Sequence, residues 1–380
     1  MTTSSPDIDR LPCLAPFAAV AVKSSYYSVC CSSVREIESA DVPVDKLFND
    51  PMYTDLRKAM LTGAELPRDC QTCLKNNGTH RAFQTEATRA VAARNLARMD
   101  ENYAIEQFEL AHAVVSFDST CNLACRTCNP EFSTTLNRTI GAATIRYLGR
   151  VPAPLSRTPD AARLELIRRT QACIEVQGGE PFLSKKFRDA LETFPKVALR
   201  IITNGTVYNA RVLEKLAEHP QVLIWVSLDG DAELNDYIRV GASFETIKSN
   251  MQKLAEAIPH VQLRVNVTLS KLNVGSIPRI LSAIEAMGAH VQGFDYHFVE
   301  DSRALRITSI SKAQREQIIA GLREMQPQGR HREDAIRMIE HVIRELQTVD
   351  TYDDAEDAAF VSFNEAVDTL VAAGLPDTTP

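Results

Sequence analysis

The sequence predicts an α/β protein whose core is a partial (β/α)6 barrel of the TIM type. From about residue 109, short apolar segments alternate with amphipathic segments through about six units. Strands and helices that alternate in this way form a parallel sheet with helices outside it, closed or nearly closed into a barrel. Polar, glycine-containing turns follow several of these strands, and such barrels carry their functional groups at the carboxyl ends of strands.

The strand candidates are short and apolar, and the segments between them have helical periodicity. Before the fifth strand, Phe244, Ile247, Met251, Leu254 and Ile258 recur at the spacing of one helix face. We expect the six strands at residues 113–117, 173–177, 198–203, 222–228, 262–269 and 293–299.

The segments on either side of the barrel have different patterns. We expect a tail at residues 1–12, a cysteine-bearing region at 13–108, the barrel at 109–305 and a helical extension at 306–380. The cysteine-bearing region should hold a hairpin (17–22 and 26–29), a helix within 45–60, a polar loop around residue 70 and a helix at 82–108. In the extension, Ser311 and Gln314 predict a capping box that opens a helix to about residue 325. Further helices should follow at 335–349 and after an acidic stretch near residue 355.

Composition excludes two classes of partner. The 380 residues carry a formal net charge of −7 and no long basic stripe, which argues against nucleic acid. No run of about 18 apolar residues occurs, so no membrane span is expected. The first ten residues lack the layout of a signal peptide. We therefore expect a cytoplasmic protein.

The cysteines cluster before residue 130, and only Cys173 lies beyond it. In a protein that is not exported, this crowding favours metal or redox chemistry over disulfides. Cys121, Cys125 and Cys128 follow the first strand with the spacing C-x₃-C-x₂-C. Three cysteines can hold an iron–sulfur cube and leave one iron open to another ligand. Inert buried thiols, or a zinc site completed by a distant fourth ligand, are the alternatives.

A second set of cysteines lies in the N-terminal region. Cys13 and the Cys30-Cys31 pair flank the expected hairpin, and Cys70 and Cys73 form a C-x₂-C pair. A hairpin brings its two ends together, so four thiols are available to close a cluster or a zinc site. A zinc knuckle is the structural alternative.

Polar motifs follow the barrel strands. The second strand ends in Gln177-Gly178-Gly179-Glu180-Pro181, the third in Thr203-Asn204-Gly205-Thr206, and the fourth in Ser227-Leu228-Asp229-Gly230. Each motif alone reads as a turn. Together, at the same end of successive strands and opposite the three cysteines, they outline one pocket. The last two strands add Asn266, Thr268, Asp295, His297 and Glu300.

These motifs, in this order, resemble the radical S-adenosylmethionine (SAM) enzymes, and the resemblance covers residues 111–300. The N-terminal region resembles the twitch- or SPASM-type sub-group, whose members carry an auxiliary cluster; the segment at 56–63 is similar as well. The chain departs from the family at Thr127, where an aromatic residue is common, and at Ser25, where the auxiliary motif usually has glycine. Because no cysteine follows Cys173, a second auxiliary cluster is not expected.

The resemblance implies roles for individual residues. Cys121, Cys125 and Cys128 would hold a 4Fe–4S cluster whose open iron binds SAM. Cys13, Cys30, Cys70 and Cys73 would hold an auxiliary 4Fe–4S cluster, with Cys31 as the alternative to Cys30. The residues implied to line the SAM site are Gly178, Gly179, Glu180, Pro181, Asn204, Ser227, Arg239 and Val299. An electron donor such as flavodoxin or ferredoxin would reduce the cluster.

The substrate is less well defined by the resemblance. We expect hydrogen abstraction from a small polar metabolite (a sugar, nucleoside or amino acid), with the auxiliary cluster aiding oxidation or substrate binding. One alternative is a maturase of a ribosomally made peptide, and another is an iron–sulfur or zinc protein without turnover. By strand position, the candidate substrate contacts are Glu175, Gln177, Asp229, Asn266, Asp295 and His297. For each of these, hydrogen bonding within the core is the alternative.

Cys173 belongs to neither of these two sets of cysteines. It shares a strand face with Glu175 and Gln177, so its thiol would point into the barrel. A thiol there could return a hydrogen atom to a substrate radical, which would make the protein an epimerase. The alternative is a buried, inert cysteine.

Overall fold

The computed structural model describes residues 8–23, 26–33, 35–38, 42–75, 82–129, 132–137, 160–299, 302–348 and 354–372. Its centre is a nine-stranded sheet with the order β3-β2-β1-β4-β5-β6-β7-β8-β9. All six predicted barrel strands are present and parallel. They are β4 (Leu110–Ser116), β5 (Thr170–Gln177), β6 (Ala198–Thr203), β7 (Val222–Ser227), β8 (Val261–Leu269) and β9 (Val291–Phe298).

The N-terminal strands extend this sheet, which the sequence did not predict. The hairpin of β1 (Ala19–Val22) and β2 (Tyr26–Ser28) forms as expected. However, β1 also pairs in parallel with β4, and β3 (Ile37–Glu38) adds an edge strand to β2. Every residue of β1 is buried. The N-terminal region and the barrel therefore share one continuous sheet.

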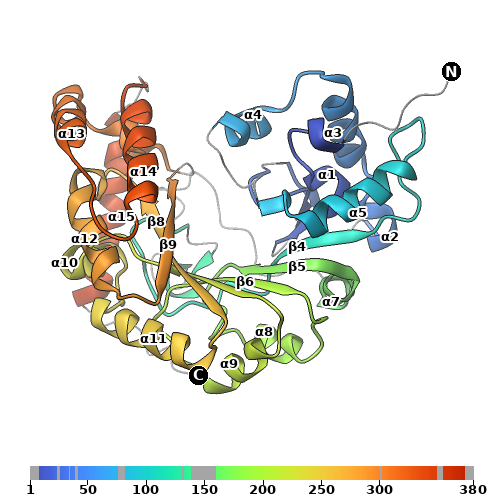
Figure 1. The fold of residues 1–380 in the computed structure, drawn as a ribbon. Coiled ribbons are helices and arrows are strands. Elements are labelled where there is room, and N and C mark those ends of the chain that lie inside the picture. Colours follow the sequence, from blue (N-terminus) through green and yellow to red (C-terminus); the bar gives the residue numbers. More distant parts are fainter. Residues whose placement is uncertain are drawn as a thin grey trace.

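The sheet is curved but open. In the described residues, β3 and β9 are its two edges and do not pair with each other. Figure 1 shows the helices along the convex side, with α3 to α5 near one edge and α12 to α14 near the other. The fold is thus the predicted partial barrel, and its sheet does not close.

Helices cover the outer face of the sheet through the predicted apolar positions. In α11 (Phe244–Ala257), Phe244, Ile247, Met251 and Leu254 are buried, as their spacing predicted. Each fully buried side chain of this size contributes about 1.5–3 kcal/mol to folding. The other covering helices are α7 (Asp160–Arg169), α8 (Lys185–Leu191), α9 (Ala210–Ala217), α10 (Ala232–Ile238) and α12 (Ile277–Ala286).

Two predictions in the N-terminal region were wrong. The segment with Cys70 and Cys73 is a helix, α4 (Arg68–Lys75), and not a polar loop. The helix predicted at 82–108 is only α5 (Glu86–Ala97). It ends early because the Asp100 carboxylate accepts hydrogen bonds from the amides of Asn102 and Ala104, which stabilises a turn with Tyr103 at φ 63°. The helices α1 (Ala15–Ala18), α2 (Val44–Leu47) and α3 (Pro51–Thr62) complete this region.

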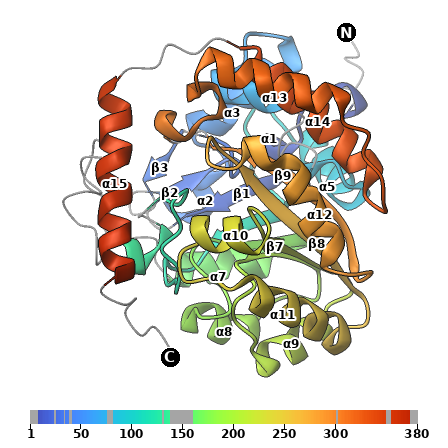
Figure 2. The same ribbon diagram turned by 90° about the vertical axis from the view of Figure 1, so that its left-hand side faces the viewer.

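The C-terminal extension contains the three predicted helices, α13 (Lys312–Glu324), α14 (Arg332–Leu346) and α15 (Asp354–Ala372). The Ser311–Gln314 capping box is present. Figure 2 shows α15 standing apart from α13 and α14, on another side of the sheet. Within the described residues, no helix combines the length and apolar character needed to cross a membrane.

Candidate active site

The three-cysteine loop leaves the carboxyl end of β4 and is fixed by its backbone. The amides of Ala124 and Arg126 donate to the carbonyl oxygens of Val240 and Ile238 at 2.9 and 2.8 Å. The Thr135 hydroxyl donates to the Cys121 carbonyl oxygen at 2.7 Å. The loop is therefore held against the segment that follows α10, at the carboxyl ends of the strands.

The thiols of this loop lie in a desolvated environment. Burial raises the pKa of Cys121 to about 12 and also raises the pKa of Cys125. The guanidinium of Arg239 acts in the opposite direction on both thiols. Thiolates are therefore costly here unless a cation accompanies them, and the iron ions of a cluster would supply that charge. The donor set thus fits an iron–sulfur cluster.

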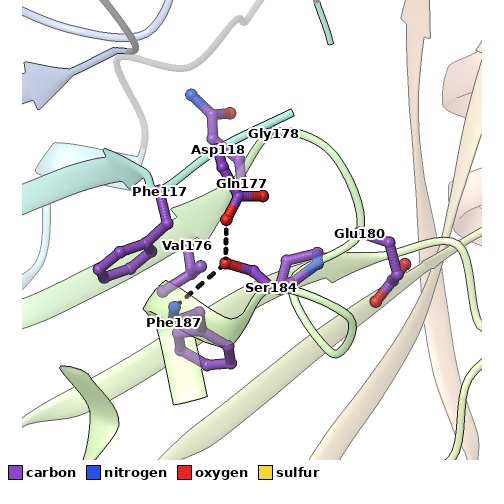
Figure 3. Close-up of a pocket in the computed structure, with 9 residues that line it drawn as sticks. Phe117, Asp118, Val176, Gln177, Gly178, Glu180, Ser184 and Phe187 are labelled. Carbon is purple, nitrogen blue, oxygen red and sulfur yellow. Dashed lines mark hydrogen bonds between the residues drawn. The ribbon is translucent and has the colours of Figure 1, made fainter. Parts of the chain in front are cut away.

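The Gly178-Gly179-Glu180-Pro181 turn packs directly on the cysteine loop. The Glu180 amide donates to the Thr120 carbonyl oxygen at 2.6 Å. A Cβ at Gly179 would lie 2.4 Å from the same oxygen, so glycine is required by this contact. Figure 3 shows the small pocket under the turn, where the Ser184 hydroxyl donates to the Asp118 carboxylate at 2.5 Å. These contacts fix the turn to the loop.

The Glu180 carboxylate is occupied by protein donors. It is buried and accepts hydrogen bonds from the Thr203 hydroxyl, the Asn204 amide at 2.7 Å and the Phe182 amide. Burial raises its pKa, and these hydrogen bonds act against that rise. In this structure Glu180 therefore joins the ends of β5 and β6, and its side chain does not present a free carboxylate.

A side-chain amide network links the cysteine loop to the end of β6. The Asn204 amide donates to Asn122 Oδ1 at 2.9 Å and lies 3.9 Å from the Cys121 sulfur. The Asn122 amide in turn donates to the Thr206 hydroxyl at 2.9 Å. Sequence reasoning placed Asn204 and Thr206 in one strand-end motif of the site but assigned no role to Asn122. The position of Asn122 directly after Cys121 was the available signal.

Asp229 is an ion-pair partner and not an open pocket residue. Its carboxylate is fully buried, lies 3.0 Å from Arg239 Nη1 and accepts a hydrogen bond from the Thr268 amide at 2.8 Å. Burial acts to lower the pKa of Arg239, but the nearby Cys125 and Asp229 outweigh it and raise that pKa. Among the described residues, the buried Nε of Arg239 has no hydrogen-bond partner. A permanent cation with an unused donor, next to two cysteines, fits an anionic group such as a carboxylate.

The remaining substrate candidates lie on the inner face of the sheet. Ser227, Asn266 and Asp295 stand side by side across β7, β8 and β9. Asp295 accepts hydrogen bonds from Trp225 Nε1 and Arg264 Nε, both at 2.7 Å. Neither Trp225 nor Arg264 was singled out from the sequence, since each was counted as part of an apolar strand. His297 is exposed and Gln177 is half-buried, while Glu300 lies outside the described residues.

Cys173 and Glu175 lie deeper in the barrel. Both are buried, at 4% and 7% exposure, and Cys173 stands four residues before the strand end at Gln177, about 13 Å along the strand. The Glu175 carboxylate is 3.8 Å from Nε2 of His112, and the Phe83 ring packs on that imidazole. Burial raises the pKa of Cys173 to about 12. These residues form the floor below the strand-end motifs.

We expect Cys173→Ala to leave SAM cleavage and the stereochemistry of the product unchanged, because its thiol lies far below the strand ends. Chiral analysis of the product, with deuterium incorporation from D₂O, checks this. Loss of solvent deuterium at the reacting carbon would instead assign Cys173 as the hydrogen donor.

His112 makes folding stability depend on pH. Burial lowers its pKa from 6.5 to about 3, so the unfolded chain binds a proton here that the native state does not. As pH falls from 6.5 toward 3, the free energy of unfolding should drop by about 1.4 kcal/mol per pH unit from this group. The effect is measured by comparing urea unfolding midpoints of Glu175→Gln with and without His112→Gln across this pH range. The Glu175→Gln background removes the neighbouring carboxylate, so the difference in pH slope comes from His112. Equal pH slopes in the two proteins would contradict it.

The four N-terminal cysteines come together at the edge of the sheet. Burial raises the pKa of Cys13 and of Cys30 to about 12, and both thiols also interact with Cys70 and Cys73. Cys31 also interacts with Cys13, so both members of the Cys30-Cys31 pair lie near the other thiols. Among the described residues, no three His, Cys, Asp or Glu side chains converge closely enough to hold a single metal ion.

Comparison with known families agrees with this site. The sequence model of the radical SAM superfamily matches residues 115–284, which begin in β4 and end in α12. Residues 115–284 therefore form a radical SAM domain. The matched residues contain the three-cysteine loop and the strand-end motifs, so the resemblance seen in the sequence is confirmed at the level of the superfamily.

Individual relatives are more distant. The mycofactocin maturase MftC of Mycobacterium ulcerans is 28% identical over 49% of this chain and 48% of its own length. The Fe-coproporphyrin III synthase of Methanosarcina barkeri is 28% identical over 43% of this chain and 38% of its own. The chain thus spans less than half the length of these relatives.

Solved structures of two kinds are similar in part. Streptococcus suis SuiB bound to precursor peptide SuiA matches with a TM-score of 0.42 and 14% identity, over 67% of this chain and 57% of SuiB. The structure of anSMEcpe with bound AdoMet matches with a TM-score of 0.39 and 16% identity, over 50% of this chain and 53% of its own.

Proposed function

We propose that the protein cleaves SAM reductively and uses the resulting radical to abstract a hydrogen atom from a peptide. The main support for SAM cleavage is the three-cysteine loop, which lies beside Arg239. The Nε of Arg239 has no hydrogen-bond partner among the described residues. Cys121, Cys125 and Cys128 would hold a 4Fe–4S cluster. When bound, that cluster supplies the electron that splits SAM into methionine and a 5′-deoxyadenosyl radical.

The residues around the loop would bind and orient SAM. Arg239, held by Asp229, would pair with the methionine carboxylate. Backbone groups of the Gly178–Pro181 turn would receive the amino group, because the Glu180 carboxylate is occupied by Thr203 and Asn204. Ser227 and Asn204 would face the ribose, and the backbone at Val299 would face adenine. Fixing these groups in advance reduces the entropy lost on binding.

A peptide is the favoured substrate because two of the relatives are named maturases. The sequence alone favoured a small polar metabolite as the substrate, and these relatives favour the peptide alternative instead. The metabolite remains the second candidate for two reasons. One relative is named a porphyrin synthase, and Asp295 with Arg264 forms an ion pair on the inner face of the sheet that could bind a small polar group.

Cys13, Cys30, Cys70 and Cys73 would hold an auxiliary cluster. Cys13, Cys30 and Cys70 each interact with Cys73, and burial raises the pKa of the first three thiols. Both observations support this assignment, because desolvated thiols favour a metal partner over free thiolates. That cluster would take one electron from the substrate radical, which leaves an oxidised product, or it would bind the substrate. A flavodoxin or ferredoxin is the kind of protein that would reduce the SAM cluster.

Anaerobic reconstitution tests the proposal. We expect about eight irons and eight sulfides per chain, consistent with two cubes, and 5′-deoxyadenosine formation with SAM and dithionite. Peptides encoded by reading frames beside the gene should stimulate SAM cleavage and change in mass. Stimulation by a low-molecular-mass metabolite fraction, with none by peptides, would select the metabolite. Bound zinc without SAM cleavage would refute the proposed function.

A further inference from the structure

The C-terminal helix α15 packs on the three-cysteine loop. Two of its residues, Phe363 and Val367, are fully buried and form an apolar cluster with three residues of the barrel side. Cys128 packs against the margin of this cluster. The three barrel-side residues are Ala124, Leu136 and Val240. One face of α15 thus lies directly beside the third cysteine.

Arg126 ties the loop to α15 by polar contacts. It stands between the second and third cysteines and is only 4% exposed. Its Nη1 donates to Asn364 Oδ1 at 3.1 Å, and its Nη2 donates to Asp368 Oδ1 at 2.6 Å. On the other side, its guanidinium packs 4.3 Å from the centre of the Tyr237 ring. A guanidinium held by these three contacts fixes the orientation of the loop.

The other part of α15 contacts the opposite end of the candidate SAM site. Phe360 is buried in an apolar cluster with Val299, Ala304 and Leu305, and the Lys271 ammonium lies 4.6 Å from its ring centre. Val299 follows β9, at the place assigned above to adenine. Seven residues separate Phe360 from Val367, which is about 10 Å along a helix. One rigid element therefore contacts both ends of the site.

We propose that α15 forms a wall of the SAM site and that Arg126 is the positioning residue that fixes this wall to the cluster loop. The inference rests on the proposed cluster at Cys121, Cys125 and Cys128. The wall excludes solvent and dioxygen from the Cys128 side of the cluster. It also holds the cluster loop and the Val299 segment at a fixed separation, so that both ends of SAM are bound together.

The test uses the reconstituted full chain. Phe363→Ala and Asp368→Ala each remove a contact that holds α15 against the loop. Arg126→Lys keeps the positive charge but removes the two-pronged guanidinium contact with Asn364 and Asp368. Glu365→Ala, on the exposed side of the same helix, is the control. The electron paramagnetic resonance signal that changes on adding SAM reports this cluster separately from the auxiliary one. We expect Phe363→Ala and Asp368→Ala to lose that signal about fivefold faster in dissolved oxygen and to bind SAM about fivefold more weakly. Arg126→Lys should lie between them and wild type.

The possible outcomes separate the two proposals. If both α15 variants match Glu365→Ala in signal lifetime and SAM affinity, with equal iron content and circular dichroism, the wall is refuted and the cluster stands. If wild type shows no SAM-responsive signal, the proposed function fails and this inference fails with it. Asp368 is exposed, so its variant keeps the test decisive should Phe363→Ala not fold.

Discussion

Replacing Cys121, Cys125 and Cys128 by alanine should remove about four of the irons and abolish 5′-deoxyadenosine formation. The three thiols lie in one loop that backbone hydrogen bonds hold at the ends of the strands. Burial disfavours the thiolates of Cys121 and Cys125 unless iron is bound, so no partial site should remain. Iron analysis and chromatographic detection of 5′-deoxyadenosine measure the two losses.

The matched control is Cys70→Ala with Cys73→Ala. Cys70 and Cys73 lie in α4 and interact with Cys30, which also interacts with Cys13. They should therefore bind the auxiliary cluster and not the SAM cluster. The double variant should also lose about four irons, but it should still cleave SAM, because the auxiliary cluster acts on the substrate and not on SAM. If instead this variant is inactive in SAM cleavage while the triple variant is active, the assignment of the two cysteine sets is reversed.

The barrel could be predicted from the sequence because its strands and helices carry clear periodicity. Ala198–Thr203 was predicted to the residue, and the face of α11 was predicted correctly. The parallel pairing of β1 with β4 was not, since it joins segments about ninety residues apart and no local pattern records it. The α4 helix was also missed. Its residues are mostly polar with two cysteines, so the segment resembles a ligand loop.

Within the site, positions were easier to predict than roles. Asp229 and Glu180 were placed correctly at strand ends, yet the structure shows both carboxylates engaged by protein donors. A sequence shows which residue follows a strand, but the direction of its side chain depends on tertiary contacts. The docking of α15 on the cysteine loop depends on Arg126 contacting residues more than two hundred positions away. No spacing in the sequence indicates that contact.

The buried pair of Asp229 and Arg239 should have a large effect on stability. Asp229→Ala leaves the Arg239 charge buried with only the cysteine loop as its counterion, so unfolding should become easier by about 3–5 kcal/mol. The double variant Asp229→Ala with Arg239→Met removes both charges and should recover most of that loss. Urea unfolding midpoints, compared at equal iron content, measure the change.

The same variants separate stability from SAM binding, because the two properties depend on Arg239 in different ways. In the double variant no cation remains to pair with the carboxylate of SAM, and a charged hydrogen bond contributes about 1.5–3 kcal/mol, so SAM should bind about tenfold or more weakly although the fold is restored. Lys215→Met, on an exposed helix face, is the control for removing a cation. A double variant that regains both stability and SAM affinity would show that Arg239 serves only to neutralise Asp229, and the carboxylate of SAM would then need another partner.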